Sequence, residues 1–435
     1  MPRALVYLAW VLLVLLLAPG AAALADEQPS WWQSLDPEWG GHLRLVGKAT
    51  QVQSDSYYQP VGDQRFYDGQ GDFRLKGKFQ LGDWGYFEAH YEAAFAGGDQ
   101  VRKDNGLAQL FPAAYSSYYL QGPISDDTRL MDLSRTISSD KSYYLYHRLD
   151  RLLLTWQPDW GTLRLGRQAI TWGAGMLFNP MDLFNPFQPT DFIRDYKIGD
   201  DMAVLQKPLG DLGNLQVLAV PRRDPDTRDV EADQSSAAAK LHLISGQTEF
   251  DLMAARHYGD NVVGAGATGY AGQAAWRADA TWTFLHDGGG YLSLVANMDY
   301  SWMWGGKNWY GWIEFYFNGL GKDDPTEAIE DPLILERVER GELFALGRVY
   351  ADAEIKVELH PLFTVYCTAI LNLYDTSGVL QPRGVWDVTQ NSQLIVGANL
   401  YFGGPGTEYG GFTLPGTPWQ TPSPDTGYLL YTYYF

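Results

Sequence analysis

The sequence has a single cysteine, a shortage of basic residues and, after its first segment, no long apolar run. Cys367 alone cannot form an internal disulfide, a cysteine-rich zinc site or a haem-attachment motif. Lys and Arg number 32 against 52 Asp and Glu, a formal charge of 32 − 52 = −20, so no basic face is to spare for nucleic acid. The chain is nevertheless 46% hydrophobic and 14% aromatic, which excludes a disordered acidic chain.

Motifs of covalent chemistry are also missing. The seven histidines are scattered, without the spacing of a zinc protease, and neither a Gly-x-Ser-x-Gly elbow nor a phosphate-binding loop occurs. Motifs do not reveal residues that only folding brings together. On this basis we expect no enzyme, no cofactor and no metal.

The first residues predict export. Arg3 precedes the apolar run 4–18, and Ala23-Leu24-Ala25 places small residues where a signal peptidase cleaves. We expect a signal peptide over 1–25 and one domain over 26–435. An uncleaved anchor is disfavoured, because the run is short and Pro19-Gly20 follows it. An exported soluble protein and an outer-membrane barrel both remain open at this point.

Alternating polarity favours the barrel. Within residues 72–81, every second side chain is charged or polar and the others are mostly apolar, and residues 348–359 show the same pattern. A single such strand also fits a soluble sheet, but here the pattern recurs along the chain. Strands are predicted near 39–52, 71–82, 84–96, 143–157, 160–170, 199–208, 212–220, 235–244, 248–258, 262–270, 273–285, 289–302, 309–318, 342–359, 361–375, 389–402 and 427–435.

These segments predict an all-β fold, a transmembrane antiparallel β-barrel with short periplasmic turns and long extracellular loops. Their number is odd, whereas bacterial barrels have even numbers. Residues 407–414 are the candidate for a missing upward strand, giving about 18 strands, with about 16 if weak segments merge. Residues 143–157 follow neither parity cleanly, which predicts a β-bulge there.

The end of the sequence carries the most specific pattern. Apolar or aromatic residues alternate through Leu429, Tyr431, Tyr433 and the terminal Phe435. This resembles the signal that outer-membrane barrels present to their assembly machinery, so the chain resembles the Gram-negative outer-membrane porins. The resemblance implies partners in that machinery, in outer-membrane lipid and lipopolysaccharide, and in a small solute; it leaves a homo-oligomer open.

A local resemblance points to a subgroup. Residues 166–173 (GRQAITWG) and 179–186 (NPMDLFNP) resemble a segment of large bacterial barrel porins that include alginate-export-like proteins. The resemblance implies a pore and names no solute.

The alternation also predicts which charged residues face the pore, because Arg or Lys on the lipid face costs about 2–4 kcal/mol at the midplane. A basic band is expected to face acidic residues across the lumen, as in a constriction that orients dipolar solutes. The alternative is a set of ion pairs that only stiffens the wall. The predicted pore-lining residues are Arg44, Lys48, Arg74, Lys76, Lys78, Glu88, His90, Glu92, Arg348, Asp352, Glu354 and Glu358.

Residues 174–198 form an unusually apolar loop that ends in charged residues. Such a loop would expose a large apolar patch outside the barrel, so we expect it to fold inward and narrow the pore. Packing on another external loop is the alternative. The predicted constriction buries Phe178, Leu183, Phe184 and Phe187, while Arg194, Asp195 and Lys197 reach the water.

The sequence therefore predicts a passive channel for small polar or charged solutes in the outer membrane of a Gram-negative bacterium. The rival hypothesis is a structural sheath around an exported partner, such as a multihaem cytochrome or a polysaccharide-export apparatus. An open bore would favour the sheath, and an inward loop the channel.

Overall fold

The computed structural model describes residues 36–110, 123–189, 191 and 193–435. The predicted signal peptide 1–25 lies outside the described residues and stays a prediction. Within the described part of the chain, no helix has both the length and the apolar character needed to cross a bilayer.

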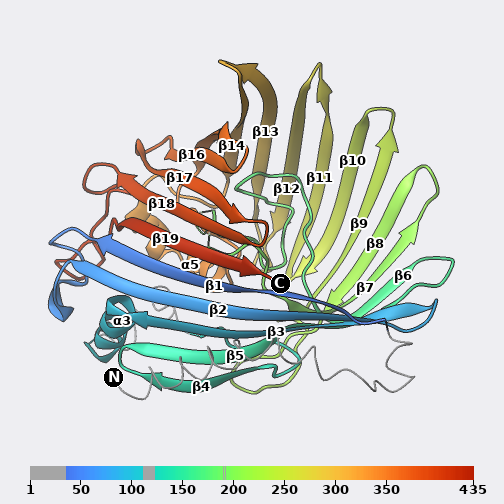
Figure 1. Cartoon of the computed structure of the whole chain (residues 1–435), viewed down its shortest axis with the longest axis horizontal. Helices are drawn as coiled ribbons and strands as arrows, with labels where there is room; N and C mark the ends of the chain where they lie inside the picture. The colour runs from blue at the N-terminus through green and yellow to red at the C-terminus, as the bar shows by residue number, and fades with distance from the viewer. Residues whose placement is uncertain (1–35, 111–122, 190, 192) are drawn as a thin grey trace.

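One antiparallel sheet contains all the strands of the described residues (Figure 1). Its first half comprises β1 (Glu38–Gln51), β2 (Arg65–Gln80), β3 (Gly85–Gly98), β4 (Ser134–Asp140), β5 (Tyr143–Trp156), β6 (Thr162–Gln168), β7 (Asp200–Pro208), β8 (Gly213–Val220), β9 (Ser236–Ser245) and β10 (Thr248–His257). Its second half comprises β11 (Asp260–Ala271), β12 (Ala274–Phe284), β13 (Gly290–Trp304), β14 (Lys307–Asn318), β15 (Val349–His360), β16 (Phe363–Asn372), β17 (Ser377–Thr389), β18 (Ser392–Phe402) and β19 (Asp425–Tyr434). Short helices lie in the connections: η2 (Gln59–Val61), α3 (Asp99–Leu110), α4 (Pro325–Glu330) and α5 (Pro332–Glu339).

The sheet closes on itself, because β1 pairs with β2 on one edge and with β19 on the other. In Figure 1 the red last strand lies beside the blue first strand. Of the 19 strands, β4 and β6 share one edge of β5, each pairing with a different half of it. The circumference therefore has 19 − 1 = 18 strand positions, which confirms the predicted antiparallel barrel of about 18 strands.

The predicted position of the missing strand was wrong. Residues 407–414 form only isolated bridges, and the additional strand is β17, before β18. Gly378, Pro382 and Gly384 interrupt its alternation in sequence. Proline has no amide hydrogen to donate, and the ladder between β17 and β18 skips residues 381–382.

The two ends of the barrel differ. At one end, here the turn end, every connection has two to five residues, as between β2 and β3 or β9 and β10. The other end, here the loop end, carries the connections 52–64, 99–142, 169–199, 221–235, 319–348 and 403–424 together with three short ones. That the turn end faces the periplasm stays a prediction.

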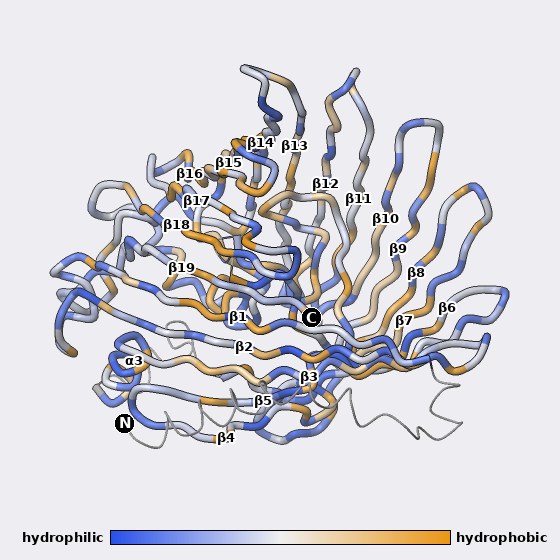
Figure 2. Tube along the Cα trace, viewed as in Figure 1, coloured by the Kyte–Doolittle hydropathy of each residue, from blue (hydrophilic) through white to orange (hydrophobic). Residues whose placement is uncertain are grey.

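The outer surface is apolar along the middle of the strands. Figure 2 shows hydrophobic and hydrophilic residues interspersed along most strands, as expected where one face meets lipid and the other does not. Exposed aliphatic side chains include Leu45, Leu165, Val217, Leu252, Ile313 and Val396. Six of the seven exposed tryptophans in the described residues lie toward the turn end, as in the aromatic girdle of a membrane barrel, whereas Trp282 lies near the loop end; the six are Trp39, Trp84, Trp156, Trp160, Trp304 and Trp386.

Candidate channel constriction

The connection from β6 to β7, here called the inward loop, crosses the barrel interior over its described residues 169–189, 191 and 193–199. Near the start of the loop, the Ala174 amide donates to Asp279 on β12 at 2.6 Å, and the Phe178 amide donates to Glu314 on β14 at 2.9 Å. Near its end, Asp195 forms an ion pair of 2.8 Å with Arg44 on β1. Strands β14 and β1 are separated in the ring by β15–β19, so these contacts place the loop across the lumen.

The Glu314 carboxylate is the main anchor of the loop on the far wall. It accepts the backbone amides of Met176, Leu177 and Phe178 at 2.5, 3.0 and 2.9 Å, and Asn297 donates to it at 3.2 Å. Hydrogen bonds to an ionised acceptor are stronger than those between neutral groups. Three consecutive amides are thus held by one side chain.

Two glycines let the loop approach the wall this closely. Gly173 has a φ of +81°, and a Cβ atom there would lie 2.9 Å from an oxygen of Asp279. A Cβ atom on Gly175 would lie 1.8 Å from the Phe178 carbonyl oxygen. Any larger residue at either position would displace the segment that Asp279 and Glu314 bind.

The apolar side chains of the loop cover an apolar part of the inner wall. Ile170, Trp172, Met181 and Phe184 are buried in one cluster with side chains from β7–β11, namely Met202, Val204, Leu218, Val220, Ala238, Met253, Ala255 and Val262. Phe178 stacks on Tyr316 with ring centroids 4.5 Å apart. The loop thus buries most of its large apolar side chains inside the barrel instead of exposing them outside, as expected for Phe178 and Phe184. The prediction for Phe187 was wrong, because its side chain is 42% exposed, and Phe192 lies outside the described residues.

A buried ion pair ties the two arms of the loop together. Lys197 donates to both oxygens of Asp182, at 2.6 and 2.8 Å, and also binds the Ile170 carbonyl at hydrogen-bond distance. Burial raises the pKa of Asp182 to about 6 and lowers that of Lys197. The expectation that Lys197 reaches the water was wrong, since the residue is 5% exposed and needs its partner inside the fold. Arg194 and Asp195 do have exposed side chains.

A charged cluster on β2, β3 and β5 receives the end of the loop. Arg74 forms ion pairs with Asp150 at 2.6 Å and Glu92 at 3.4 Å, and Arg148 pairs with Glu92 at 2.8 Å. Tyr196 of the loop donates to Glu92 at 2.9 Å, and the Arg74 guanidinium lies 3.7 Å from the centre of its ring. Arg74 and Glu92 were predicted to line the pore, and the structure brings them together in this buried cluster.

Arg148 and Asp150 were not among the predicted site residues. The β3–β5 ladder shifts register between His90 and Tyr91 and leaves Asp150 unpaired, which confirms the predicted bulge. The bulge brings Arg148, Asp150 and Arg151 to one side of the strand, where all three contact the network. The irregular alternation of polar and apolar residues in 143–157 was therefore the sequence signal for the part of the site that lies on β5.

The other predicted residues of the basic band have nearby acidic partners or stay solvated. Lys78 pairs with Glu38 at 3.2 Å, and His90 lies 2.8 Å from Glu88. Lys76 is exposed and Lys48 is half-buried. Arg74 and Lys78 thus pair with acids on neighbouring strands and His90 with an acid on its own strand, as in the stiffened-wall alternative. Any influence of these residues on ion preference stays a prediction.

The acidic residues predicted to line the opposite wall likewise include side chains with partners and a side chain without one. Glu354 pairs with Arg383 at 2.8 Å, and Glu358 accepts from Asn308 at 2.8 Å. Asp352 is buried beside Glu314 on the neighbouring strand, and neither of its carboxylate oxygens has a hydrogen-bond partner within the described residues. Arg348 precedes β15 and pairs with Asp323 at 3.5 Å, so it belongs to the loop end instead of the predicted strand.

Comparison with known proteins finds solved structures that share this architecture. No family model and no curated protein matches the chain. Among solved structures, Pseudomonas aeruginosa OpdQ is 11% identical with a TM-score of 0.50, covering 92% of this chain and 99% of that one. Acinetobacter baumannii OccAB1 is 8% identical with a TM-score of 0.51, covering 92% of this chain and 96% of that one.

The chain has a porin fold. At these identities the likeness is one of fold, and it confirms the predicted resemblance to outer-membrane porins at that level.

The last strand closes the porin barrel. Leu429, Tyr431, Tyr433 and Phe435 are exposed on its outer face, and Phe435 exchanges backbone hydrogen bonds with Gly41. The alternation predicted from the sequence is therefore present at the seam with β1. Recognition of these residues by assembly machinery stays a prediction.

The anchors of the loop, Glu314 and Asp279, were missed as site residues although both lie in predicted strands. Alternation places Glu314 on the face that carries Trp312 and Tyr316 at neighbouring inward positions, so an acid in an aromatic strand was a visible signal. Its partners, three amides about 140 positions away in sequence, were not predictable from local patterns.

Proposed function

We propose that the protein is an outer-membrane channel of the porin type, through which small polar or charged solutes pass without any covalent step. The observation that carries this proposal is the inward loop, which crosses the lumen and is fixed on the wall at Glu314, Asp279 and Arg44. A loop held at several points narrows a bore permanently, as a size-selective channel requires.

The sheath hypothesis fits this geometry less well. A sheath must leave the bore open for its partner, whereas here the buried cluster around Trp172 and Phe184 fills part of the bore with side chains. The outer apolar surface and the tryptophans near the turn end support insertion in a membrane. The proposal includes contacts with lipopolysaccharide and with the assembly machinery, and it leaves a homo-oligomer open.

Planar-bilayer recording of the purified protein tests the proposal. We expect discrete single-channel openings, and a higher conductance when residues 176–189 are deleted, because the obstruction is removed. Shortening the connection 221–235 by deleting residues 225–233 is the matched control, since these residues lie outside the inward loop, and it should leave the conductance unchanged. If the full chain and both deletion variants fold but show no openings, the channel proposal is overturned. If deleting residues 176–189 leaves the conductance unchanged, the assignment of the inward loop as the constriction is overturned.

A further inference from the structure

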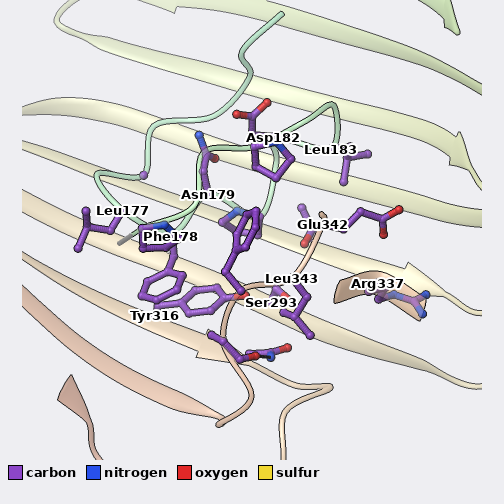
Figure 3. A pocket seen from close by; sticks show the side chains of 18 of the residues that line it. Leu177, Phe178, Asn179, Asp182, Leu183, Ser293, Tyr316, Arg337, Glu342 and Leu343 are labelled. Carbon is purple, nitrogen blue, oxygen red and sulfur yellow. Dashed lines mark hydrogen bonds between the residues drawn. The ribbon is translucent and has the colours of Figure 1, made fainter. Parts of the chain in front are cut away.

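A cavity of about 180 Å³ lies at the loop end of the barrel. It is lined by the inward loop, by the wall β12–β14 and by residues 342–345 of the connection before β15 (Figure 3). A cavity of about 150 Å³ in another protein holds benzene, so this one accommodates a single six-membered ring with substituents. The space is therefore large enough for a specific small molecule.

The charges around the cavity are already balanced. Within the part of the chain that the structure describes, the charged residues that line it are Asp182, Arg337 and Glu342. Asp182 pairs with Lys197 and Arg337 pairs with Asp260. Glu342 lies 3.2 Å from His257 and near the charges of Arg340 and Arg337, and its Oε1 atom accepts no hydrogen bond within the described residues. An anionic ligand would lose its hydration without gaining a free counter-charge, so the site favours a neutral ligand over an anion.

One side of the cavity is aromatic. Phe178 and Tyr316 stack with an interplanar angle of 8°, and both line the space, as does the partly exposed Phe187. Figure 3 shows Phe178 and Tyr316 side by side, one from the loop and one from β14. Because the two rings stack on each other and Phe178 also packs on Tyr350 with centroids 5.2 Å apart, the pair offers the cavity a fixed apolar aromatic side, against which a ring can pack.

The wall side offers hydroxyl groups. Thr281 and Thr283 on β12 are 4% and 6% exposed, and Ser293 lies directly opposite Thr281 on β13. Within the described residues, neither threonine hydroxyl has a hydrogen-bond partner, and both residues line the cavity. Buried hydroxyls normally have partners, so these two are available to a ligand.

We propose that this cavity is a binding site for an uncharged ring compound that carries hydroxyl groups. The ring packs on the side of Phe178 and Tyr316, and its hydroxyls bind Thr281 and Thr283. That the bound compound is also a transported solute rests on the proposed function. At the loop end, the site would hold that solute before it passes the inward loop.

Titration calorimetry of the purified full chain in detergent tests the site with two pairs of probes. Glucose and catechol are uncharged hydroxylated rings, and gluconate and benzoate are charged relatives. We expect saturable binding of at least one neutral probe and none of the charged ones. Binding of glucose alone identifies a sugar-type ligand, and binding of catechol alone an aromatic alcohol; either supports the site.

Replacing both hydroxyls with methyl groups, in the double variant Thr281→Val and Thr283→Val, should weaken binding about tenfold, because two neutral hydrogen bonds are lost. Thr281→Ser with Thr283→Ser should restore it. Thr268→Val is the matched control, since Thr268 pairs with inward-facing Arg277 but does not line the cavity. Heat-modifiable migration on electrophoresis verifies that each variant is folded.

Absence of binding by both neutral probes, equal binding of the charged ones, or equal weakening by the Thr268 control would overturn the site. These outcomes are separate from the channel proposal. Channel openings in a bilayer without probe binding would support the channel proposal and overturn the binding site. Probe binding without openings would support the binding site and overturn the channel proposal.

Discussion

Arg74 illustrates how single residues of the inner wall combine two roles. Its side chain is 2% exposed and lies among Glu92, Asp150 and the Tyr196 ring. It therefore neutralises buried acids of the wall and at the same time supports the end of the inward loop.

Replacing Arg74 with Gln should destabilise the barrel. The acids Asp150 and Glu92 would lose part of their compensation, and breaking a buried ion pair from one side costs about 3–5 kcal/mol. The urea midpoint for loss of the folded, heat-modifiable form should fall accordingly. Lys76→Gln, on the same strand but exposed, serves as control and should leave the midpoint in place.

Replacing Glu314 with Gln should loosen the start of the inward loop. The amide keeps the shape but loses the charge and one acceptor oxygen, so three backbone amides compete for a weaker partner. We expect a noisier open-channel current in single-channel recordings. Glu249→Gln, at a rim position that contacts His242 and not the loop, should behave like the wild type; equal noise in both variants would contradict the anchoring role.

At the scale of elements, alternation predicted every described strand except the short β4 and β17. The polar inner faces of β2, β3 and β15 made them plain in sequence. Strands β7–β9 were predicted as well, although they carry apolar residues inward where the loop covers them, whereas β17 was missed because Pro382 interrupts its alternation. The inward direction of the loop was predictable from its composition, whereas its anchors depend on contacts between distant segments.

Helix α3 at the loop end should respond to pH. Asp104 is buried there and accepts hydrogen bonds from Tyr58 at 3.0 Å and Gln100 at 2.8 Å, yet burial raises its pKa from 3.8 to about 6. The folded state favours the protonated carboxyl group of Asp104. The stability of the folded helix α3 therefore falls as the pH rises from about 4 to 6. The shift corresponds to at most about 3 kcal/mol.

Hydrogen exchange of residues 99–110, corrected for intrinsic rates, measures this effect. Protection should decrease between pH 4 and pH 6 and then level off. Asp104→Asn should abolish the pH dependence, while Asn at the exposed Asp63 should preserve it. Protection that rises with pH would show that the ionised carboxylate is the stabilising form.

At the scale of the whole molecule, the unequal ends of the barrel define a topology that can be tested. In a chain with Cys367 replaced by Ala, cysteine at Ser139 of β4 should react with an impermeant thiol reagent on intact cells. Cysteine at Gln247, in the tight turn between β9 and β10, should react only after the outer membrane is permeabilised. The opposite labelling would reverse the orientation.

The path of the inward loop also constrains the order in which the molecule can be assembled. The wall that the loop covers, β7–β11, is built from strands consecutive in the chain, so loop and wall can associate while the sheet is still open. Contacts of the loop with Arg44 require β1, which completes the ring only by meeting β19. A loop already seated on β7–β11 would present Asp195 and Tyr196 to the arriving first strands. The element that narrows the finished channel would then also guide the closing of its seam.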